Sequence, residues 1–208
     1  TLGTKWEWPS GGEIDIQEAY WQGDTHFLKC NLCWNGNSNI WDTRWNSQNY
    51  RIAGFNDPDW DKKYHTWVMD WDPDRITVTL DGEKILEQDL NQAINQGEWG
   101  EGTQGKCPFR EPQYILLDLP IGGDAGGEID DSKLPQQLEV DYTRCYRKAT
   151  RINDGLQPAE TVDLTPGTEP EYFADTTTPK APTGYKLCWN DEFDEGTWPA
   201  SSRWNVQN

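Results

Sequence analysis

The sequence predicts an all-β sandwich over residues 1–146. Apolar and polar side chains alternate along a series of short segments, the pattern of strands with one buried face. Turn signals separate these segments, among them Asp81-Gly82, a pair that accepts positive φ and is typical of a tight hairpin. Helical periodicity is scarce. The segments expected to form strands are 13–21, 25–34, 64–72, 75–80, 84–89, 113–118 and 137–146.

The first strand carries three carboxylates, Glu13, Asp15 and Glu18, within six residues. Ile14 and Ile16 alternate with Glu13 and Asp15, so these two carboxylates point to the same face. Strict alternation puts Glu18 on the opposite face, but a β-bulge would return it, and bulges are common beside active sites. Three crowded carboxylates cannot all stay ionised. At least one pKa should therefore rise, as an acid catalyst requires.

The second strand contains two of the five cysteines, Cys30 and Cys33. Their C-x-x-C spacing resembles a metal motif, but residues three apart on a strand face opposite sides. No second Cys or His pair completes a zinc site. Free or core thiols are therefore the favoured interpretation, with a single disulfide as the main alternative.

The strand at 64–72 carries Trp67 and Trp71, which are four residues apart and hence on one face. We expect both in the core. The chain has thirteen tryptophans among 208 residues, a large excess. Core packing accounts for several of them. Aromatic faces also stack on the C–H faces of sugar rings, so the excess is compatible with a carbohydrate ligand.

The net charge of -18 and a pI near 4.3 argue against nucleic acid and anionic membrane surfaces as partners. The acidity is otherwise explained by solubility. No run of roughly 18 or more apolar residues occurs, so we expect no membrane span. No basic and apolar signal segment opens the sequence. Since Thr1 is not a natural start, a signal could have been removed.

The stretch 147–184 is polar, rich in Thr and Glu, and contains five prolines, which predicts a linker or an extended surface segment. Strand pattern returns at 185–189. Residues 126–130 repeat the letters G-G-E-I-D of residues 11–15, but their continuation is turn-like. We expect this second copy to be a surface loop without catalytic carboxylates.

Residues 8–18 (W-P-S-G-G-E-I-D-I-Q-E) resemble the active-site strand of glycoside hydrolase family 16, which includes laminarinases, lichenases, agarases and endo-β-galactosidases. Further segments are similar to motifs of that family in the same order. They are H-T-W-V-M-D-W at 65–71, the strand and hairpin at 75–82, the P-F and P-Q-Y-I-L-L-D-L segments within 108–123, and the closing strand at 134–146. The resemblance covers residues 1–146.

The order of the segments departs from the family. Residues 185–205 resemble the opening of a family 16 domain, yet they come last, and strands that normally follow the opening are missing from both ends. Two explanations are open. The chain contains the end of one domain, the linker 147–184 and the start of a second tandem domain at 185–208, or it is a circular permutant that has lost sequence.

The resemblance implies a jelly-roll β-sandwich of the concanavalin type and a retaining glycosidase mechanism without a catalytic cofactor. Glu13 would be the nucleophile and Glu18 the general acid/base, with Asp15 hydrogen-bonded to Glu13 between them. Retaining glycosidases hold two carboxyl groups about 5–5.5 Å apart. Neighbouring positions on one strand face are spaced at about 6.6 Å, a distance that a bulge adjusts.

The resemblance also implies substrate contacts. Trp8 and Trp34 would stack on sugars and His26 would contact substrate near Glu18, with core packing or an ordinary strand histidine as the alternatives. A structural Ca²⁺ would be held by Asp141 and Glu192, unless both are ordinary surface carboxylates.

The expected function is that of an endo-acting retaining β-glycanase that cleaves a β-1,3-glucan or a galactose-containing glycan. We expect a monomer that is secreted, periplasmic or at the surface of a bacterial cell. The alternatives are a non-catalytic carbohydrate-binding sandwich and an inactive fragment.

Overall fold

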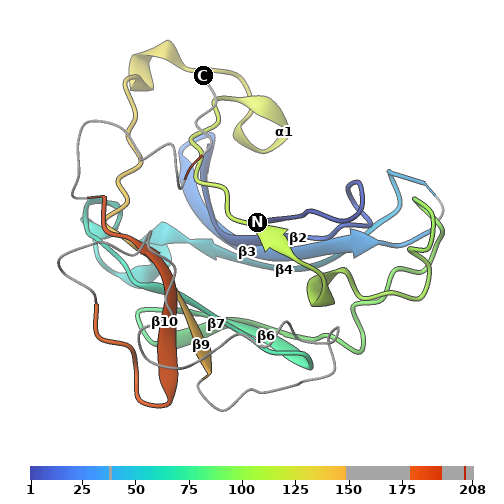
Figure 1. Cartoon of the computed structure of the whole chain (residues 1–208). Helices are drawn as coiled ribbons and strands as arrows, with labels where there is room; N and C mark the ends of the chain where they lie inside the picture. Colours follow the sequence, from blue (N-terminus) through green and yellow to red (C-terminus); the bar gives the residue numbers. More distant parts are fainter. Residues whose placement is uncertain (38, 149–178, 194–203, 205–208) are drawn as a thin grey trace. The chain divides into compact units, whose positions relative to one another are not determined.

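The structure, a computed structural model, describes residues 1–37, 39–148, 179–193 and 204 (Figure 1). These residues form antiparallel β-sheets with few and short helices, which confirms the predicted all-β class. The chain divides into two compact units, Thr1–Gln137 and Leu138–Asn208. No helix among the described residues is long and apolar enough to cross a membrane.

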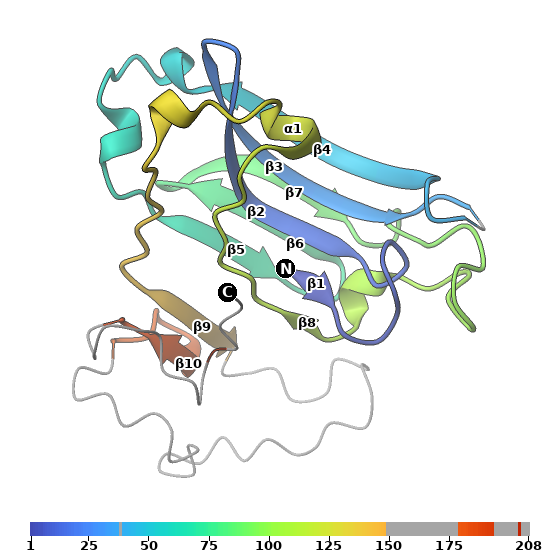
Figure 2. The ribbon, with the colours of Figure 1, turned by 90° about the horizontal axis from the view of Figure 1, so that it is seen from above.

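The first unit contains two antiparallel sheets (Figure 2). Five strands follow the order β4-β3-β2-β1-β8, and three strands follow the order β5-β6-β7. The strands are β1 (Leu2–Gly3), β2 (Glu13–Gln22), β3 (Thr25–Asn35), β4 (Thr43–Arg51), β5 (Trp67–Trp71), β6 (Arg75–Leu80), β7 (Glu83–Asp89) and β8 (Gln113–Tyr114). The short helices are η1 (Ile52–Phe55), η2 (Trp60–Lys62), η3 (Pro108–Arg110), α1 (Gly123–Gly126) and η4 (Asp131–Lys133).

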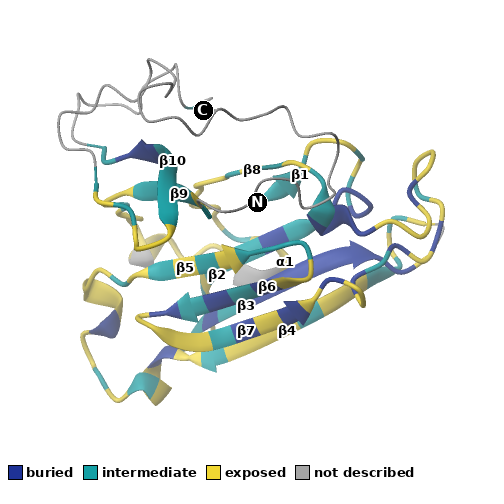
Figure 3. Cartoon of the chain, turned by 60° about the horizontal axis from the view of Figure 1, so that its bottom comes forward, coloured by how far each residue is buried: buried dark blue, intermediate teal, exposed yellow. Residues whose placement is uncertain are grey.

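The two sheets share one buried core, which confirms the predicted sandwich. Ile14 of β2 and Leu32 of β3 belong to the same buried cluster as Ile76 of β6 and Leu86 of β7, and each is at most 2% exposed. Buried positions alternate with exposed or partly buried ones along β6, as expected for a strand with one face on the core (Figure 3). The layer between the sheets therefore holds the five-stranded sheet in place.

Two local predictions are confirmed within this frame. Asp81 and Gly82 have φ of 50° and 89° and form the tight hairpin between β6 and β7. Trp67 and Trp71 are partly buried against the core cluster. The indole Nε1 of Trp71 donates a hydrogen bond of 2.8 Å to the carbonyl oxygen of Phe109, so the polar atom of this ring is also satisfied.

Other strand predictions differ from the structure. The strand β4 was not predicted, because neither face of Thr43–Arg51 shows an apolar row: it pairs with β3 at the edge of the sheet and is mostly exposed. The predicted strand 113–118 is paired only over Gln113–Tyr114, and the predicted strand 137–146 is found at Thr143–Lys148. Apolar residues that follow β8, such as Leu116 and Leu119, are about half exposed rather than buried in a ladder.

The second unit contains one antiparallel pair, β9 (Thr143–Lys148) with β10 (Tyr185–Asp191). The segment that resembles the closing strand of the family thus pairs with the segment that resembles its opening. Most of the predicted linker 147–184, and residues 194–203 and 205–208 of the predicted opening segment, lie outside the described residues. The assignment of these segments to one or two domains remains a prediction.

Candidate active site

The loop before β2 sets the start of the carboxylate strand. Gly12 has a φ of 78°, and a side chain there would place its Cβ 2.9 Å from the Cβ of Pro108. The fully buried Asn95 donates from Nδ2 to the carbonyl oxygen of Ser10 at 2.9 Å and accepts from the backbone N–H of Asn35 at 3.1 Å. This amide ties the loop to the end of β3, so Glu13 enters β2 at a fixed position.

A β-bulge brings the three carboxylates to one face of β2. Asp15 pairs with Asn31 of β3, and Glu18 pairs with Lys29, so two residues of β2 oppose Cys30 alone. The bulge that was predicted between Asp15 and Glu18 is therefore present. The opposite face of β2 carries Ile14 into the core. We call the side of β2, β3 and β4 that bears the three carboxylates the carboxylate face.

Two tryptophans hold Glu13 and its surroundings. The indole Nε1 of Trp8 donates a hydrogen bond of 2.6 Å to Oε2 of Glu13. The indole Nε1 of Trp99 donates to the carbonyl oxygen of Trp8 at 3.1 Å. Trp8 is thus brought to the cluster as predicted, although its observed contact is a hydrogen bond rather than a stacking surface. The indole can only donate, so this Glu13 oxygen acts as an acceptor.

The surroundings of the three carboxylates raise the pKa values of Asp15 and Glu18. Burial, followed by the charge of Glu13, raises the pKa of Asp15 from 3.8 to about 6, against the hydrogen bond from Asn31. Burial and then the charge of Asp15 raise the pKa of Glu18, while Lys29 and Asn31 act in the opposite direction. At least one pKa was predicted to rise and two do, but burial is the larger cause of each rise and the crowding of charges the smaller one.

His26 and Trp34 are not brought to the carboxylates. Both lie on β3 at positions that share the core side with Leu28 and Leu32, whereas Asn31 and Lys29 lie on the carboxylate face. Trp34 is 8% exposed and packs edge-on against a core phenylalanine at a centroid distance of 6.2 Å. The predicted stacking role of Trp34 is thus replaced by the alternative of core packing.

His26 likewise faces away from Glu18. Its Nδ1 lies 3.5 Å from Oδ2 of Asp61, and its ring stacks on Trp21 at a centroid distance of 4.4 Å. Burial lowers the pKa of His26, and Asp61 opposes this effect. The structure therefore does not bring His26 to Glu18, because the two side chains point to opposite faces of the sheet.

Three residues of the carboxylate face were not predicted. Asn31 is fully buried and donates from Nδ2 to Oδ2 of Asp15 at 3.0 Å and to Oε2 of Glu18 at 2.5 Å. Lys29 Nζ lies 3.8 Å from Oε2 of Glu18 and 5.5 Å from the centre of the Trp45 ring. Trp45 is 44% exposed on the unpredicted strand β4, opposite Cys33. β4 therefore presents a partly exposed aromatic ring on the carboxylate face.

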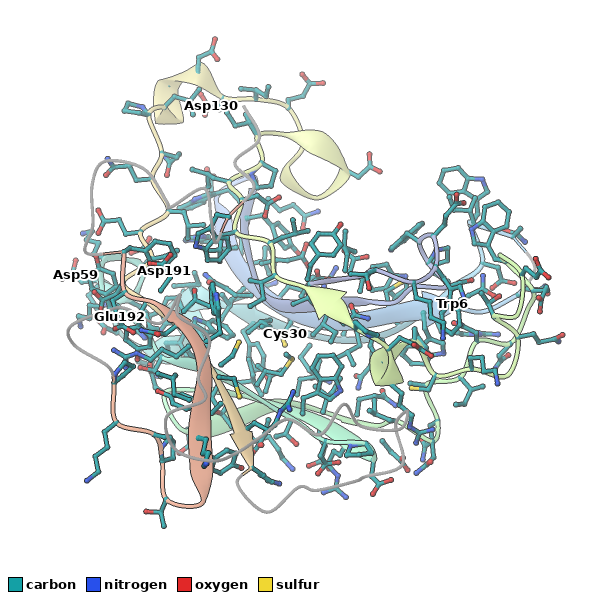
Figure 4. The ribbon with its side chains drawn as sticks, viewed as in Figure 1. Trp6, Cys30, Asp59, Asp130, Asp191 and Glu192 are labelled. Carbon is teal, nitrogen blue, oxygen red and sulfur yellow. The ribbon has the colours of Figure 1, made fainter. Side chains whose placement is uncertain are left out.

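The cysteines match the favoured prediction of free thiols. All five are free, and Cys30, Cys33 and Cys107 are buried. Cys30 belongs to the core cluster and lies between the sheets in Figure 4, whereas Cys33 pairs with Glu13 on the carboxylate face. Burial raises the pKa of the Cys33 thiol, and the charge of Glu13 adds to the effect. The C-x-x-C pair therefore points to opposite faces as expected and does not form a bidentate motif.

The second copy of the G-E-I-D letters lies apart from the cluster. It follows α1 and precedes η4 in an exposed loop, where Asp130 accepts a hydrogen bond from the backbone N–H of Ser132 at 3.0 Å (Figure 4). Ile129 is 58% exposed. The structure thus places this copy in a surface loop, in agreement with the prediction.

The residues predicted to bind calcium lie in the second unit. Oε2 of Glu192 accepts a hydrogen bond of 2.5 Å from Nη2 of Arg144, and Oε1 accepts one of 2.9 Å from Nε. The guanidinium would repel a second cation at these oxygens. In this arrangement Glu192 does not fit a calcium site with Asp141, and no group of three or more Cys, His, Asp and Glu side chains among the described residues could hold a metal ion.

Comparisons with known proteins identify relatives of this chain. The family model described as "Glycosyl hydrolases family 16" matches residues 2–143. The chain is 26% identical over 155 residues to glucan endo-1,3-beta-glucosidase A1 of Niallia circulans. This match covers 68% of the chain and 20% of the relative. The chain is also 27% identical over 140 residues to keratan-sulfate endo-1,4-beta-galactosidase of Sphingobacterium multivorum. This second match covers 67% of the chain and 29% of the relative. The chain therefore spans less than a third of either protein.

Among solved structures, the chain is similar to that of LamAcat from Zobellia galactanivorans. The identity is 23% and the TM-score is 0.44, and the match covers 61% of this chain and 42% of that structure.

Proposed function

The chain belongs to glycosyl hydrolases family 16, and from this premise we propose that it is an endo-acting retaining β-glycanase. The observation that carries the proposal is the carboxylate face, where a bulge sets Glu13, Asp15 and Glu18 side by side. A retaining glycosidase needs one carboxylate to attack the sugar and one carboxylic acid to protonate the leaving group. The raised pKa values of Asp15 and Glu18 favour the protonated form of these two groups beside Glu13.

In the first step, a carboxylate oxygen of Glu13 attacks the anomeric carbon while the bond to the leaving oxygen breaks. Glu18 donates its proton to that oxygen, so the departing sugar leaves as an alcohol. The raised pKa of Glu18 keeps this proton available closer to neutral pH than an exposed glutamate would. The products are a covalent glycosyl-enzyme and an ionised Glu18.

In the second step, Glu18 takes a proton from a water molecule as that water attacks the anomeric carbon. The bond to Glu13 breaks, and the sugar is released with its original anomeric configuration. Asp15 hydrogen-bonds Glu13 and has a pKa of about 6. We assign it the task of holding a proton that it shares with Glu13: the proton stays on Asp15 while Glu13 is the neutral ester, and it is again shared when the glycosyl bond breaks and the Glu13 carboxylate returns.

The substrate we propose is a β-linked glycan with glucose or galactose in the cleaved unit. Relatives with these two specificities, named an endo-1,3-β-glucosidase and an endo-1,4-β-galactosidase, match the chain at nearly the same identity. A polysaccharide is too large to cross a membrane unaided, so we propose that the protein acts outside the cytoplasm. We also propose that it acts as a monomer, because the cluster is built from one chain.

The test uses laminarin, lichenan, agarose and mucin-type glycans with wild type, Glu13→Gln and Glu128→Gln. Glu128 is the matched control, because it stands in the exposed second copy of the same letters. We expect new reducing ends from at least one glycan with wild type and Glu128→Gln, and a loss of about 10³-fold or more with Glu13→Gln. If all three proteins bind a glycan and none cleaves it, the chain is a binding module and the proposal is wrong.

A further inference from the structure

We propose that Asn31 is a positioning residue that fixes which oxygen of Glu18 and of Asp15 carries the proton. The inference rests on the function proposed for the carboxylate cluster and assigns to it a residue from the neighbouring strand. It starts from one side-chain amide that donates to both acidic side chains.

The geometry of the amide is that of a clamp across the bulge. The two N–H groups on Nδ2 of Asn31 reach Oδ2 of Asp15 at 3.0 Å and Oε2 of Glu18 at 2.5 Å. Asn31 pairs with Asp15 in the ladder, and the bulge returns Glu18 to within reach of the same amide. In the opposite orientation the amide oxygen would face these carboxyl oxygens and could bond only to a protonated one, whereas Nδ2 donates to them in either protonation state.

A purely structural role does not explain this residue. Asn31 is 0% exposed, and its Oδ1 is buried without a hydrogen-bond partner among the described residues. A buried amide with an unpaired oxygen costs free energy that an apolar side chain would avoid. Most other buried positions of β3, such as Leu32, carry apolar side chains, and the buried Asn35 donates to a backbone carbonyl rather than to an acid. The two contacts with the acidic pair are what distinguishes Asn31.

The hydrogen bonds determine where the protons lie. When either carboxyl group is protonated, the oxygen that accepts from Asn31 is its carbonyl oxygen, the stronger acceptor, so the proton is on the other oxygen. For Glu18 this is Oε1, because Lys29 Nζ also addresses Oε2, at 3.8 Å. For Asp15 it is Oδ1. Asn31 thus leaves one defined hydroxyl on each acid, and a general acid is effective only when its proton points at the leaving oxygen.

The clamp also moderates the acidity of Glu18. The charged groups that act on Glu18 are Asp15 of β2, Lys29 of β3 and Asp118 after β8. Burial and both aspartates raise its pKa, whereas Lys29 and the amide of Asn31 lower it. Loss of the amide therefore removes one of the two contributions that favour the ionised form, and the pKa of Glu18 must rise further.

The experiment compares Asn31→Leu with Asn35→Leu in the full chain. Asn35 is a matched control: it is also 0% exposed on β3 and shares the face of Asn31. Within the part of the chain that the structure describes, its buried Oδ1 has no hydrogen-bond partner and its Nδ2 donates to a backbone carbonyl, not to a carboxylate. The readouts are the carboxyl ¹³C titrations of Glu18 and Asp15, the pH profile of laminarin hydrolysis and the thermal midpoint of unfolding.

For Asn31→Leu we expect the pKa of Glu18 to rise by about one pH unit and the alkaline limb of the profile to move up with it. We expect kcat to fall by about 10- to 100-fold, because the acid loses its orientation. Asn35→Leu should lower the thermal midpoint and leave the titrations of Glu18 and Asp15 as they are in wild type. Equal titrations in the two variants and in wild type would overturn the proposal.

A wild-type measurement covers the case in which Asn31→Leu does not fold. The side-chain amide resonances of Asn31 should shift with pH in step with Glu18 and Asp15, and resonances that stay constant would overturn the proposal. Both titrations are independent of activity. If wild type cleaves no glycan while the Asn31 resonances follow the acids, the proposed function fails and the clamp stands.

Discussion

Replacement of Asp15 by Asn should stabilise the fold at neutral pH while it impairs catalysis. Burial and the charge of Glu13 raise the pKa of Asp15 from 3.8 to about 6. Each unit of difference between the folded and unfolded pKa corresponds to about 1.36 kcal/mol, so the ionisation of Asp15 costs the folded state about 3 kcal/mol. Asparagine keeps the shape of the side chain and has no charge to accommodate.

The sign of the pH dependence follows from proton binding. Between pH 3.8 and about 6 the folded protein holds a proton on Asp15 that the unfolded chain has released. The contribution of Asp15 to the free energy of unfolding therefore falls as pH rises through this window. Above about pH 6 this stabilisation is fully lost. In Asp15→Asn this loss is absent, so the variant gains stability relative to wild type as pH increases.

The assay is urea unfolding of both proteins, followed by tryptophan fluorescence, at about pH 3.5 and about pH 7.5. We expect the free energy of unfolding of Asp15→Asn, relative to wild type, to be larger at the higher pH by up to about 3 kcal/mol. Glu128→Asn, in the exposed loop, is the control and should show no such change. A difference between Asp15→Asn and wild type that is the same at both pH values would refute the reasoning.

Three further changes test the site and the core. Trp8→Phe removes the N–H donor to Glu13 and should lower kcat about tenfold, with KM for the cleaved glycan nearly unchanged. A tenfold rise in KM would point to sugar stacking by Trp8 instead. Trp45→Ala should raise KM about three- to tenfold at constant kcat, and an unchanged KM would exclude a subsite on β4. Leu32→Ala should lower the free energy of unfolding by about 2–5 kcal/mol, against less than about 0.5 kcal/mol for the half-exposed Leu119→Ala.

The bulge could be predicted because it follows from the spacing of residues within one strand. Glu13 and Asp15 are two apart and Glu18 is three further on, so only an extra residue brings all three to one face. Asn31 could not be predicted in the same way. Its place opposite Asp15 depends on the register between β2 and β3, which is set by the bulge and by the turn from Gln22 to Thr25 together.

The sequence does contain a signal for the side of β3 on which His26 and Trp34 lie. Alternation divides β3 into two rows, and the row with Leu28 and Leu32 is the more apolar one. His26 and Trp34 have the same parity as these leucines, so the core side was the better assignment for both. Parity alone could not show that Trp45 is available instead, because β4 has no apolar row that marks it as a strand.

A bulge by itself does not indicate a catalytic site. β7 also has an extra residue, Ile85, between the pairs Val78–Leu86 and Thr79–Lys84, and Ile85 packs against the core. At the bulge of β2 the irregular register coincides with a carboxyl group whose pKa is raised to about 6 and with the buried amide of Asn31. The raised carboxyl pKa and the buried amide both lower stability, and a sandwich assembled for stability alone would not place them at a bulge. Their concentration within a few residues of two neighbouring strands is therefore the physical argument for function, and Asp15→Asn tests it directly, because a catalytic cluster should lose activity where the fold gains stability.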